Sequence, residues 1–220
     1  MNRPIRSFVL RQGRTTPAQA RALETLFPKY GVGFSHEQLR SPRAAPLVLE
    51  IGSGMGETTI AIAKAHPEVD FVAVEVHGPG IGSLLNRIDV EGLANLRVIR
   101  HDAVQVLEHM VADGTLAAIH LFFPDPWPKK RHHKRRLVQP AFAALAARKL
   151  IEGGILHAAT DWPDYADWMD QVLRKEPLLE PAPRGFTARP VTKFESRGRR
   201  LGHPVRDLVF RREGKAPAGR

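Results

Sequence analysis

The sequence contains no cysteine among its 220 residues, so disulfide bonds and thiolate zinc sites are excluded. None of its 10 histidines has the spacing of a metal-binding motif, and we expect no metal cofactor. Long apolar runs are also missing. No stretch approaches the roughly 18 residues of a transmembrane helix, and the N-terminus does not resemble a signal peptide. These absences predict a soluble cytoplasmic protein without a membrane partner.

Positive charge is in excess and unevenly distributed along the chain. The formal net charge is +10, which is typical of proteins with a polyanionic partner. Residues 1–46 carry 8 cations and 2 anions, residues 121–136 carry 6 and 1, and residues 183–220 carry 11 and 3. The segments between these blocks have an excess of acidic residues. This pattern predicts three basic blocks around a folded acidic core.

The chain divides into three regions by composition. Residues 1–46 are predicted to form a basic N-terminal arm and a helix that runs from Thr16-Pro17 to about Tyr30, because Thr favours the N-cap and Pro the first helical position. Residues 47–212 are predicted to form the main domain. The whole chain is 43% hydrophobic, and a segment of this length with such a composition suits a single core. Residues 213–220 are expected to be a disordered tail.

Short apolar runs alternate with helical patterns in the main domain. This alternation predicts βαβ units and an α/β, Rossmann-like fold with a mainly parallel sheet, in which the last strand is antiparallel. The expected strands cover 47–51, 70–76, 95–100, 116–123, 154–160 and 205–212, and the expected helices cover 57–65, 81–90, 103–110, 140–150 and 163–174.

Acidic side chains recur where the predicted parallel strands end. Ligands of such sheets bind beyond the carboxyl ends of the strands, so side chains at these ends are expected to meet at one edge. That juxtaposition is the main prediction from the sequence. The carboxylates concerned are Glu50, Glu75, Asp102, Asp125 and Asp161.

The glycine-rich segment EIGSGMGE (50–57) joins the first strand to the first helix. It lacks the third glycine of the dinucleotide fingerprint, and a pyrophosphate there would meet Glu50 and Glu57. A ligand with an ammonium and a sulfonium group suits these charges, which indicates S-adenosylmethionine bound at Gly52 and Gly54. A purely structural strand-to-helix turn would use the same residues, so that alternative stays open.

Two further carboxylates fit the same ligand. Glu75 ends the second strand about 20 residues after the loop, as expected of an acid that binds ribose hydroxyls, although a surface Glu is the simpler alternative. Asp102 ends the third strand, where it suits the adenine amino group. It is equally well placed to cap the helix that begins at Ala103, and the two roles are compatible.

The segment FFPDPWPKKRHHKRR (122–136) combines a stiff acidic turn with six cations. Prolines on both sides of Asp125 restrict the turn, so the carboxylate and Trp127 are held in place before a substrate arrives. Such a turn suits hydrogen bonding and stacking with a nucleobase, while the cations bind flanking phosphates. A solvated basic face or a targeting tract is the alternative for the cations.

Several segments resemble the bacterial tRNA (guanine-N7)-methyltransferases, in the expected order from about Arg6 to Phe210. The resemblance implies a class I methyltransferase fold with a mostly parallel seven-stranded sheet, one antiparallel strand and helices on both faces. It also implies S-adenosylmethionine as methyl donor, tRNA as partner, and N7 of guanine 46 in the variable loop as acceptor. The segments are RSFVLRQGR, LEIGSGMGE, VEVH, RHDA, FFPDPWPKKRHHKRR, ATDW and TKFESRGRRLGH.

Residue roles carried over from this family complete the predicted site. The resemblance assigns the donor to Glu50, Glu75, Asp102 and Asp125, and makes Asp125 catalytic as well. The substrate and RNA contacts that it implies are Lys129, Arg131, His132, His133, Lys134, Arg135, Arg136, Asp161, Thr192, Lys193, Phe194 and Glu195.

Two of the carried-over roles have structural alternatives. Thr192 to Glu195 also read as a helix capping box, and Asp161 is placed to cap the next helix. Two other functions stay open as well: a class I methyltransferase with a different substrate, and a non-catalytic RNA-binding protein on the same scaffold. The oligomeric state and the set of accepted tRNAs do not follow from the sequence.

Overall fold

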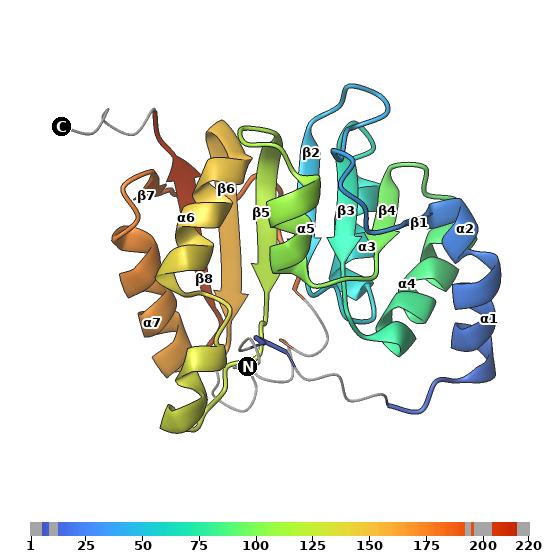
Figure 1. The fold of residues 1–220 in the computed structure, drawn as a ribbon, viewed down its shortest axis with the longest axis horizontal. Coiled ribbons are helices and arrows are strands. Elements are labelled where there is room, and N and C mark those ends of the chain that lie inside the picture. The colour runs from blue at the N-terminus through green and yellow to red at the C-terminus, as the bar shows by residue number, and fades with distance from the viewer. Residues whose placement is uncertain (1–5, 9–12, 192–194, 196–203, 215–220) are drawn as a thin grey trace.

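The apolar runs of the sequence form one central β-sheet in the computed structural model, which describes residues 6–8, 13–191, 195 and 204–214 (Figure 1). The sheet has eight strands in the order β1-β4-β3-β2-β5-β6-β8-β7. Its strands are β1 (Gly31–Val32), β2 (Leu47–Ile51), β3 (Asp70–Val74), β4 (Leu96–Ile99), β5 (Leu116–Phe122), β6 (Leu150–Thr160), β7 (Leu179–Pro181) and β8 (Arg206–Arg212).

The pairing confirms a mostly parallel sheet with one reversed strand, but the count of seven strands is wrong. All pairs from β1 to β6 are parallel, and β8 is antiparallel to both β6 and β7. The additional strand is β1, which joins the edge by pairing with β4. Strands of two and three residues, as in β1 and β7, leave no apolar run from which they can be recognised.

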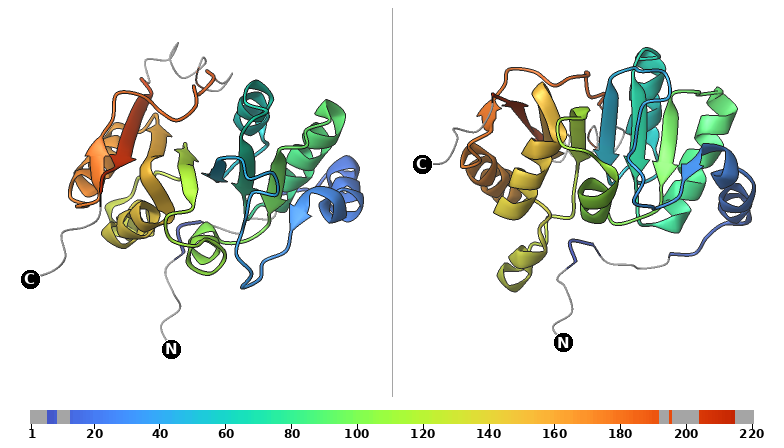
Figure 2. Two further views of the ribbon diagram at one scale, coloured as in Figure 1. Left: turned by 90° about the horizontal axis from the view of Figure 1, so that it is seen from above. Right: turned by 45° about the horizontal axis from the view of Figure 1, so that its top comes forward.

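Helices cover both faces of the sheet, as Figure 2 shows. One face packs against α5, α6 and α7, and the other against α3 and α4, with α1 lying on α4. The helices are α1 (Pro17–Thr25), α2 (Phe27–Tyr30), α3 (Glu57–Ala65), α4 (Gly78–Glu91), α5 (Ala103–Met110), α6 (Pro140–Lys149) and α7 (Pro163–Arg174), with a 3₁₀ helix η1 (Lys130–Arg135).

The N-terminal helix differs from the prediction in one respect. Thr16 is its N-cap and forms the predicted start, with a capping box to Gln19. The single helix expected up to Tyr30 is divided into α1 and α2, because Pro28 has no N–H to donate to the preceding turn. The domain boundary expected at residue 46 stays a prediction, although residues 31–32 already belong to the sheet.

The central strands are buried on both faces. Leu47, Leu49 and Ile51 of β2 pack with α5, α6 and α7, whereas Val48 packs on the side of α3 and α4. Burying each such side chain contributes about 1.5–3 kcal/mol. Glu50 shares the side of Val48, because successive side chains alternate across a strand. The carboxylate at its end therefore points toward α3.

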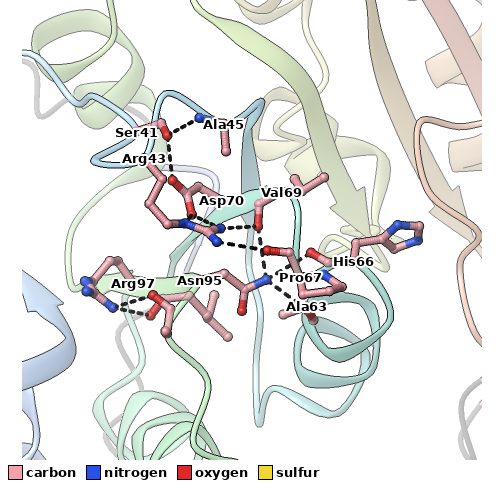
Figure 3. A network of polar contacts seen from close by, with 12 residues as sticks. Ser41, Arg43, Ala45, Ala63, His66, Pro67, Val69, Asp70, Asn95 and Arg97 are labelled. Atoms are coloured by element: carbon pink, nitrogen blue, oxygen red, sulfur yellow. Dashed lines mark hydrogen bonds and ion pairs between the residues drawn. The ribbon is translucent and has the colours of Figure 1, made fainter.

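A polar network fixes the amino-terminal edge of the sheet (Figure 3). The side-chain amide nitrogen of Asn95 lies 3.0 Å from the carbonyl oxygens of Ala63, His66 and Val69. Nearby, the buried carboxylate of Asp70 accepts hydrogen bonds from Ser41 and Arg43. These contacts join the end of α3 to the starts of β3 and β4, at the edge opposite the carboxyl ends of the strands.

Every helix within the described ranges is too short or too polar to cross a lipid bilayer. The same ranges hold no group of three or more His, Asp or Glu side chains arranged to bind a metal ion.

Candidate active site

The carboxyl ends of the parallel strands surround a cavity of about 400 Å³. In Figure 1 these ends point to the bottom of the view. The cavity wall combines polar strand ends, the β5 turn and two residues of the arm. It includes Ser7, Phe8, Gly52, Glu75, His77, His101, Asp102, Phe122, Phe123 and Asp125. The cavity therefore lies at the edge of the sheet at which the sequence predicts a ligand site.

Glu75 organises the glycine loop from the end of β3. Its carboxylate accepts hydrogen bonds from the backbone N–H groups of Gly54 (2.9 Å), Val76 (2.7 Å) and His77 (2.9 Å). The loop approaches α4 closely, because a Cβ atom on Gly80 would lie 2.5 Å from the carbonyl oxygen of Gly54. Gly54 itself has φ +55°, a left-handed conformation that favours glycine. The loop is thus fixed before a ligand binds.

Glu50 lies under this loop and is not one of the residues that line the cavity. It is only 4% exposed, and its carboxylate accepts a hydrogen bond from Thr59 of α3 (3.0 Å). Burial raises the pKa of Glu50 to about 7, with a contribution from the charge of Glu75, although the hydrogen bond from Thr59 opposes the shift. No cation pairs with either carboxylate in the described part of the chain. Two acids without a cation partner indicate a cationic ligand.

Asp102 has the capping role that the sequence left open. Its side chain accepts a hydrogen bond from the N–H of Val104 (2.9 Å), so it is the N-cap of α5. The residue also lines the cavity, next to His101. One carboxylate oxygen is enough for the cap, so capping and ligand binding are compatible at this position.

Asp125 stands on the rim of the cavity in a turn of unusual backbone geometry. Phe123 and Trp127, on either side of the Pro124-Asp125-Pro126 sequence, have φ +54° and +46°. Residues other than glycine rarely adopt a positive φ, so contacts with the surrounding structure must hold the turn in this conformation. Partial burial raises the pKa of Asp125, and repulsion from Glu75 adds to the effect. The carboxylates at the ends of β3 and β5 therefore interact across the cavity.

Trp127 is partly buried and contacts the N-terminal arm and two side chains of the basic run. Its indole N–H donates to the carbonyl oxygen of Ser7 in the N-terminal arm (3.0 Å). The guanidinium of Arg135 lies 5.0 Å from its ring centroid, and His132 contacts it edge-on at 5.8 Å. Stacking of this ring on a nucleobase stays a prediction, and the structure shows that the indole joins the arm to the Asp125 turn.

Most of the basic run is exposed beside the cavity. Lys129, Lys130, Arg131 and Lys134 are exposed, and they belong to η1 or directly precede it. His132, His133 and Arg135 are partly buried against the turn. A 3₁₀ helix places its cations close together, so this segment presents a dense positive surface to solvent.

Arg136 is the buried member of the basic run. Its side chain is 1% exposed, and its Nε donates to the carbonyl oxygen of Pro126 (2.9 Å). The guanidinium also pairs with Asp164 and lies 4.9 Å from the ring centroid of Tyr165. Arg136 therefore holds the turn that contains Asp125, and it also lines the basic groove described below.

The remaining predicted substrate residues differ in their placement. Asp161 follows β6 and is partly buried, but it does not cap α7. The N-cap is Trp162, whose N–H is bound by the hydroxyl of Thr160. Glu195 is buried and paired with Arg189. Thr192, Lys193 and Phe194, with the capping box expected there, lie outside the described residues.

A basic groove of about 900 Å³ adjoins the cavity and shares Ser7, Phe8 and Asp102 with it. Its cations include residues that the sequence reasoning missed. Arg100 directly follows β4, so the rule that selected the strand-end carboxylates should have included it. Arg148, in α6, gives no such signal. None of the following five forms an ion pair with another described residue: Arg6, Arg100, Lys134, Arg135 and Arg148.

Two solved methyltransferases have a similar fold. A 16S rRNA methyltransferase, KamB, matches with a TM-score of 0.53 at 17% identity, over 80% of this chain and 96% of that chain. A SAM-dependent O-methyltransferase from Thermotoga maritima matches with a TM-score of 0.54 at 13% identity, over 82% of this chain and 69% of that chain. At these identities the likeness concerns the fold alone.

Sequence comparisons are more specific. A family described as "Putative methyltransferase" matches residues 44–208. A "tRNA (guanine-N(7)-)-methyltransferase" of Methylobacillus flagellatus is 54% identical over 96% of this chain and 92% of that protein. A protein of the same name from Nitrosomonas eutropha is 56% identical over 94% of this chain and 96% of that protein. The chain therefore belongs to the tRNA (guanine-N(7)-)-methyltransferase family.

Proposed function

We propose that this protein transfers the methyl group of S-adenosylmethionine to N7 of guanine 46 in the variable loop of tRNA, in the cytoplasm. The observation that best supports the proposal is a cavity with acidic walls that adjoins a basic surface. A cationic donor suits the cavity, and an RNA backbone suits the cations of η1 and the adjoining groove. A methyltransferase acting on a small molecule has no use for the second feature.

The donor is assigned to the glycine loop and the strand ends. The fit rests on the charges of this chain, because Glu50 and Glu75 are ionisable groups without a cation partner in the described part of the structure. Glu75 and Asp102 would bind the nucleoside, and the left-handed glycines let the backbone approach it. Glu50 would act through its charge from beneath the loop. The donor supplies an electrophilic methyl group on its sulfonium.

The chemistry that remains for the protein is mainly positioning. Guanine N7 has a lone pair and no proton, so no general base is needed to expose it. A base held in line with the methyl group gains rate from orientation alone. The methylated base is cationic, so the fixed carboxylate of Asp125 would stabilise the charge as it develops. Asp125 occupies the rim, between the cavity and the basic run.

The acceptor is assigned to the segment that follows β6. Asp161 offers an acceptor for the N–H groups of guanine, and Lys129 offers a cation for the adjacent phosphate. Thr192, Lys193, Phe194 and Glu195 are included on the family resemblance. We assign the flanking RNA backbone to the exposed cations of η1 and to Arg100 and Arg148 of the groove.

Glu50 makes donor binding depend on pH. With its pKa raised to about 7, Glu50 is partly protonated at neutral pH, and a bound cation favours the ionised form. Donor binding should therefore release a proton, and the affinity should rise by up to about tenfold between about pH 6 and about pH 8. Titration calorimetry in two buffers of different ionisation enthalpy measures both quantities.

The matched variant for this experiment is Glu50→Gln, which keeps the shape and removes the ionisation. His77 and His101 also line the cavity, and any pH dependence that they cause persists in this variant. A wild-type affinity that is constant over the same range would exclude the linkage to Glu50.

Methyl transfer to unmodified tRNA tests the proposed function directly. After incubation with enzyme and donor, borohydride and aniline treatment should cut the RNA at position 46, because 7-methylguanine is labile to this treatment. A cut at a different guanine would show that this guanine, and not guanine 46, is the acceptor. Donor turnover with small molecules but not with tRNA would favour another substrate class, and RNA binding without donor binding would favour a non-catalytic protein.

A further inference from the structure

Two residues of the N-terminal arm form part of the donor cavity, and the chemistry described above does not use them. Ser7 and Phe8 line the cavity and also line the basic groove, so they lie where the two spaces meet. Both are partly buried. The apolar ring of Phe8 therefore stands between the space proposed for the donor and the space proposed for the RNA backbone.

This part of the arm is joined to the Asp125 turn by one polar contact. The indole N–H of Trp127 donates to the carbonyl oxygen of Ser7 (3.0 Å). Among the described residues, it is the only hydrogen bond between residues 6–8 and the rest of the chain. A neutral hydrogen bond contributes little net free energy, because water can replace either partner. The placement of Phe8 at the cavity thus depends on a bond that is easily broken.

Two cations of the groove flank this junction. Arg6 directly precedes Ser7, and its guanidinium carbon lies 5.8 Å from the ring centroid of Phe8. Arg135 belongs to η1, and its guanidinium carbon lies 5.0 Å from the ring centroid of Trp127. Both arginines line the groove, and neither forms an ion pair with another described residue. Each aromatic side chain at the junction therefore has an unpaired arginine beside it.

The positions of the two arginines link the arm to an RNA backbone. Arg6 belongs to the arm, whereas Arg135 belongs to the segment that follows the Asp125 turn, so phosphates lying in the groove would bind to both sides of the junction. Arginine suits this bridge, because its planar fork binds phosphate while its face remains on an aromatic ring. RNA in the groove would hold residues 6–8 against the turn, and Phe8 against the donor cavity.

We propose that the N-terminal arm couples RNA binding to donor binding. A phosphate backbone in the groove fixes Phe8 as a wall of the donor cavity, and the hydrogen bond from Trp127 to Ser7 carries the coupling. The inference rests on the proposed function for the identity of both ligands. Because coupling between two sites is reciprocal, a bound donor must strengthen RNA binding by the same factor. Phe8 and Trp127 act here as positioning residues.

Titration calorimetry with sinefungin tests the proposal. Sinefungin is an analogue of S-adenosylmethionine that carries an amine in place of the methylated sulfonium and cannot transfer a methyl group. Its dissociation constant is measured with the enzyme alone and with the enzyme saturated by unmodified tRNA, at one salt concentration. Saturating tRNA should lower this constant by about fivefold to twentyfold, and saturating sinefungin should lower the dissociation constant of tRNA by the same factor.

Two variants test the residues assigned to the coupling. Trp127→Phe keeps an aromatic ring for Arg135 and removes the indole N–H, so the coupling factor should fall below about twofold. Phe8→Ala should have the same effect, because no ring is left to be held against the donor. The coupling factor is the ratio of two affinities of the same variant, so a general loss of affinity does not change it.

Trp168→Phe is the matched control. Trp168 lies in α7, and its indole N–H also donates to a backbone carbonyl oxygen, that of Val138 (2.7 Å). Trp168 lines neither the donor cavity nor the groove. The same substitution at this position removes an equivalent hydrogen bond and should leave the coupling factor at its wild-type value.

Two results would overturn the inference and leave the proposed function standing. One is a wild-type enzyme that methylates tRNA although its coupling factor is below about twofold. The other is a wild-type coupling factor in Trp127→Phe or in Phe8→Ala, and Phe8→Ala decides alone if Trp127→Phe does not fold. An enzyme that binds sinefungin but not tRNA would instead contradict the proposed function, and the inference with it.

Discussion

Asp125→Ala is expected to lower the rate of methyl transfer by about a hundredfold to a thousandfold, the cost of losing one fixed electrostatic group at a reacting centre. The carboxylate stands on the rim, in a turn held by two left-handed residues and two prolines, and no other described carboxylate shares this turn. S-adenosylmethionine should still bind, since Glu75 and the glycine loop are untouched. Single-turnover methyl transfer and titration calorimetry measure the two effects separately.

Asp125→Asn separates the charge of this residue from its shape. If the negative charge stabilises the developing cation, the amide should be nearly as inactive as alanine. In the wild-type enzyme the raised pKa of Asp125 implies that protonation begins at a higher pH than for an ordinary aspartate. Turnover should therefore fall as the pH drops through the pKa of Asp125. An active Asp125→Asn enzyme would show that positioning suffices without the charge.

Arg136→Met should unfold more easily and turn over slowly, although its affinity for RNA should show the same salt dependence as wild type. Arg136 is buried and holds the carbonyl oxygen of Pro126, and its loss leaves this acceptor and Asp164 without their partner. A contact of this kind contributes about 2–3 kcal/mol to the free energy of unfolding. Urea unfolding measures the stability, and single-turnover kinetics measure the effect on the Asp125 turn.

Lys130→Gln combined with Lys134→Gln is the matched control, because both lysines are exposed on the same 3₁₀ helix. This variant should keep its stability and lose affinity for tRNA. Its plot of log affinity against log salt concentration should be less steep by about 0.7–0.9 per lost phosphate contact. If Arg136→Met shows that flatter slope and a wild-type stability, Arg136 is a phosphate ligand and the assignment made here is wrong.

The parts of the site that the sequence predicted well are those controlled by local rules. Glu75 and Asp102 follow buried parallel strands, and parallel strands bring their carboxyl ends to one edge whatever the loops do. The capping roles of Thr16 and Asp102 depend on residues within three positions along the chain, and the structure shows both. Asp161, read by the same rule, does not cap α7, because the helix begins at Pro163 and Trp162 is its N-cap.

The parts that sequence reasoning missed depend on contacts between distant segments. Arg136 reads as one more cation in a basic run, and only its packing against Pro126 and Tyr165 turns it inward. Trp127 reads as a stacking platform, and only the tertiary structure shows that the arm, 120 residues earlier, supplies a carbonyl oxygen for its indole. Arg189 lies outside the segments that first drew attention to the site.

The sequence by itself determined the α/β architecture, the acidic edge of the sheet and the family, because strand periodicity, strand-end chemistry and motif order are all written along the chain. The tertiary structure alone decided which charges face a ligand and which hold the site together. Burial distinguishes Arg136 and Arg189 from the exposed lysines of η1. A cation withdrawn from water must pair with a carboxylate or carbonyl brought to it by the fold, and the order of residues does not reveal that partner.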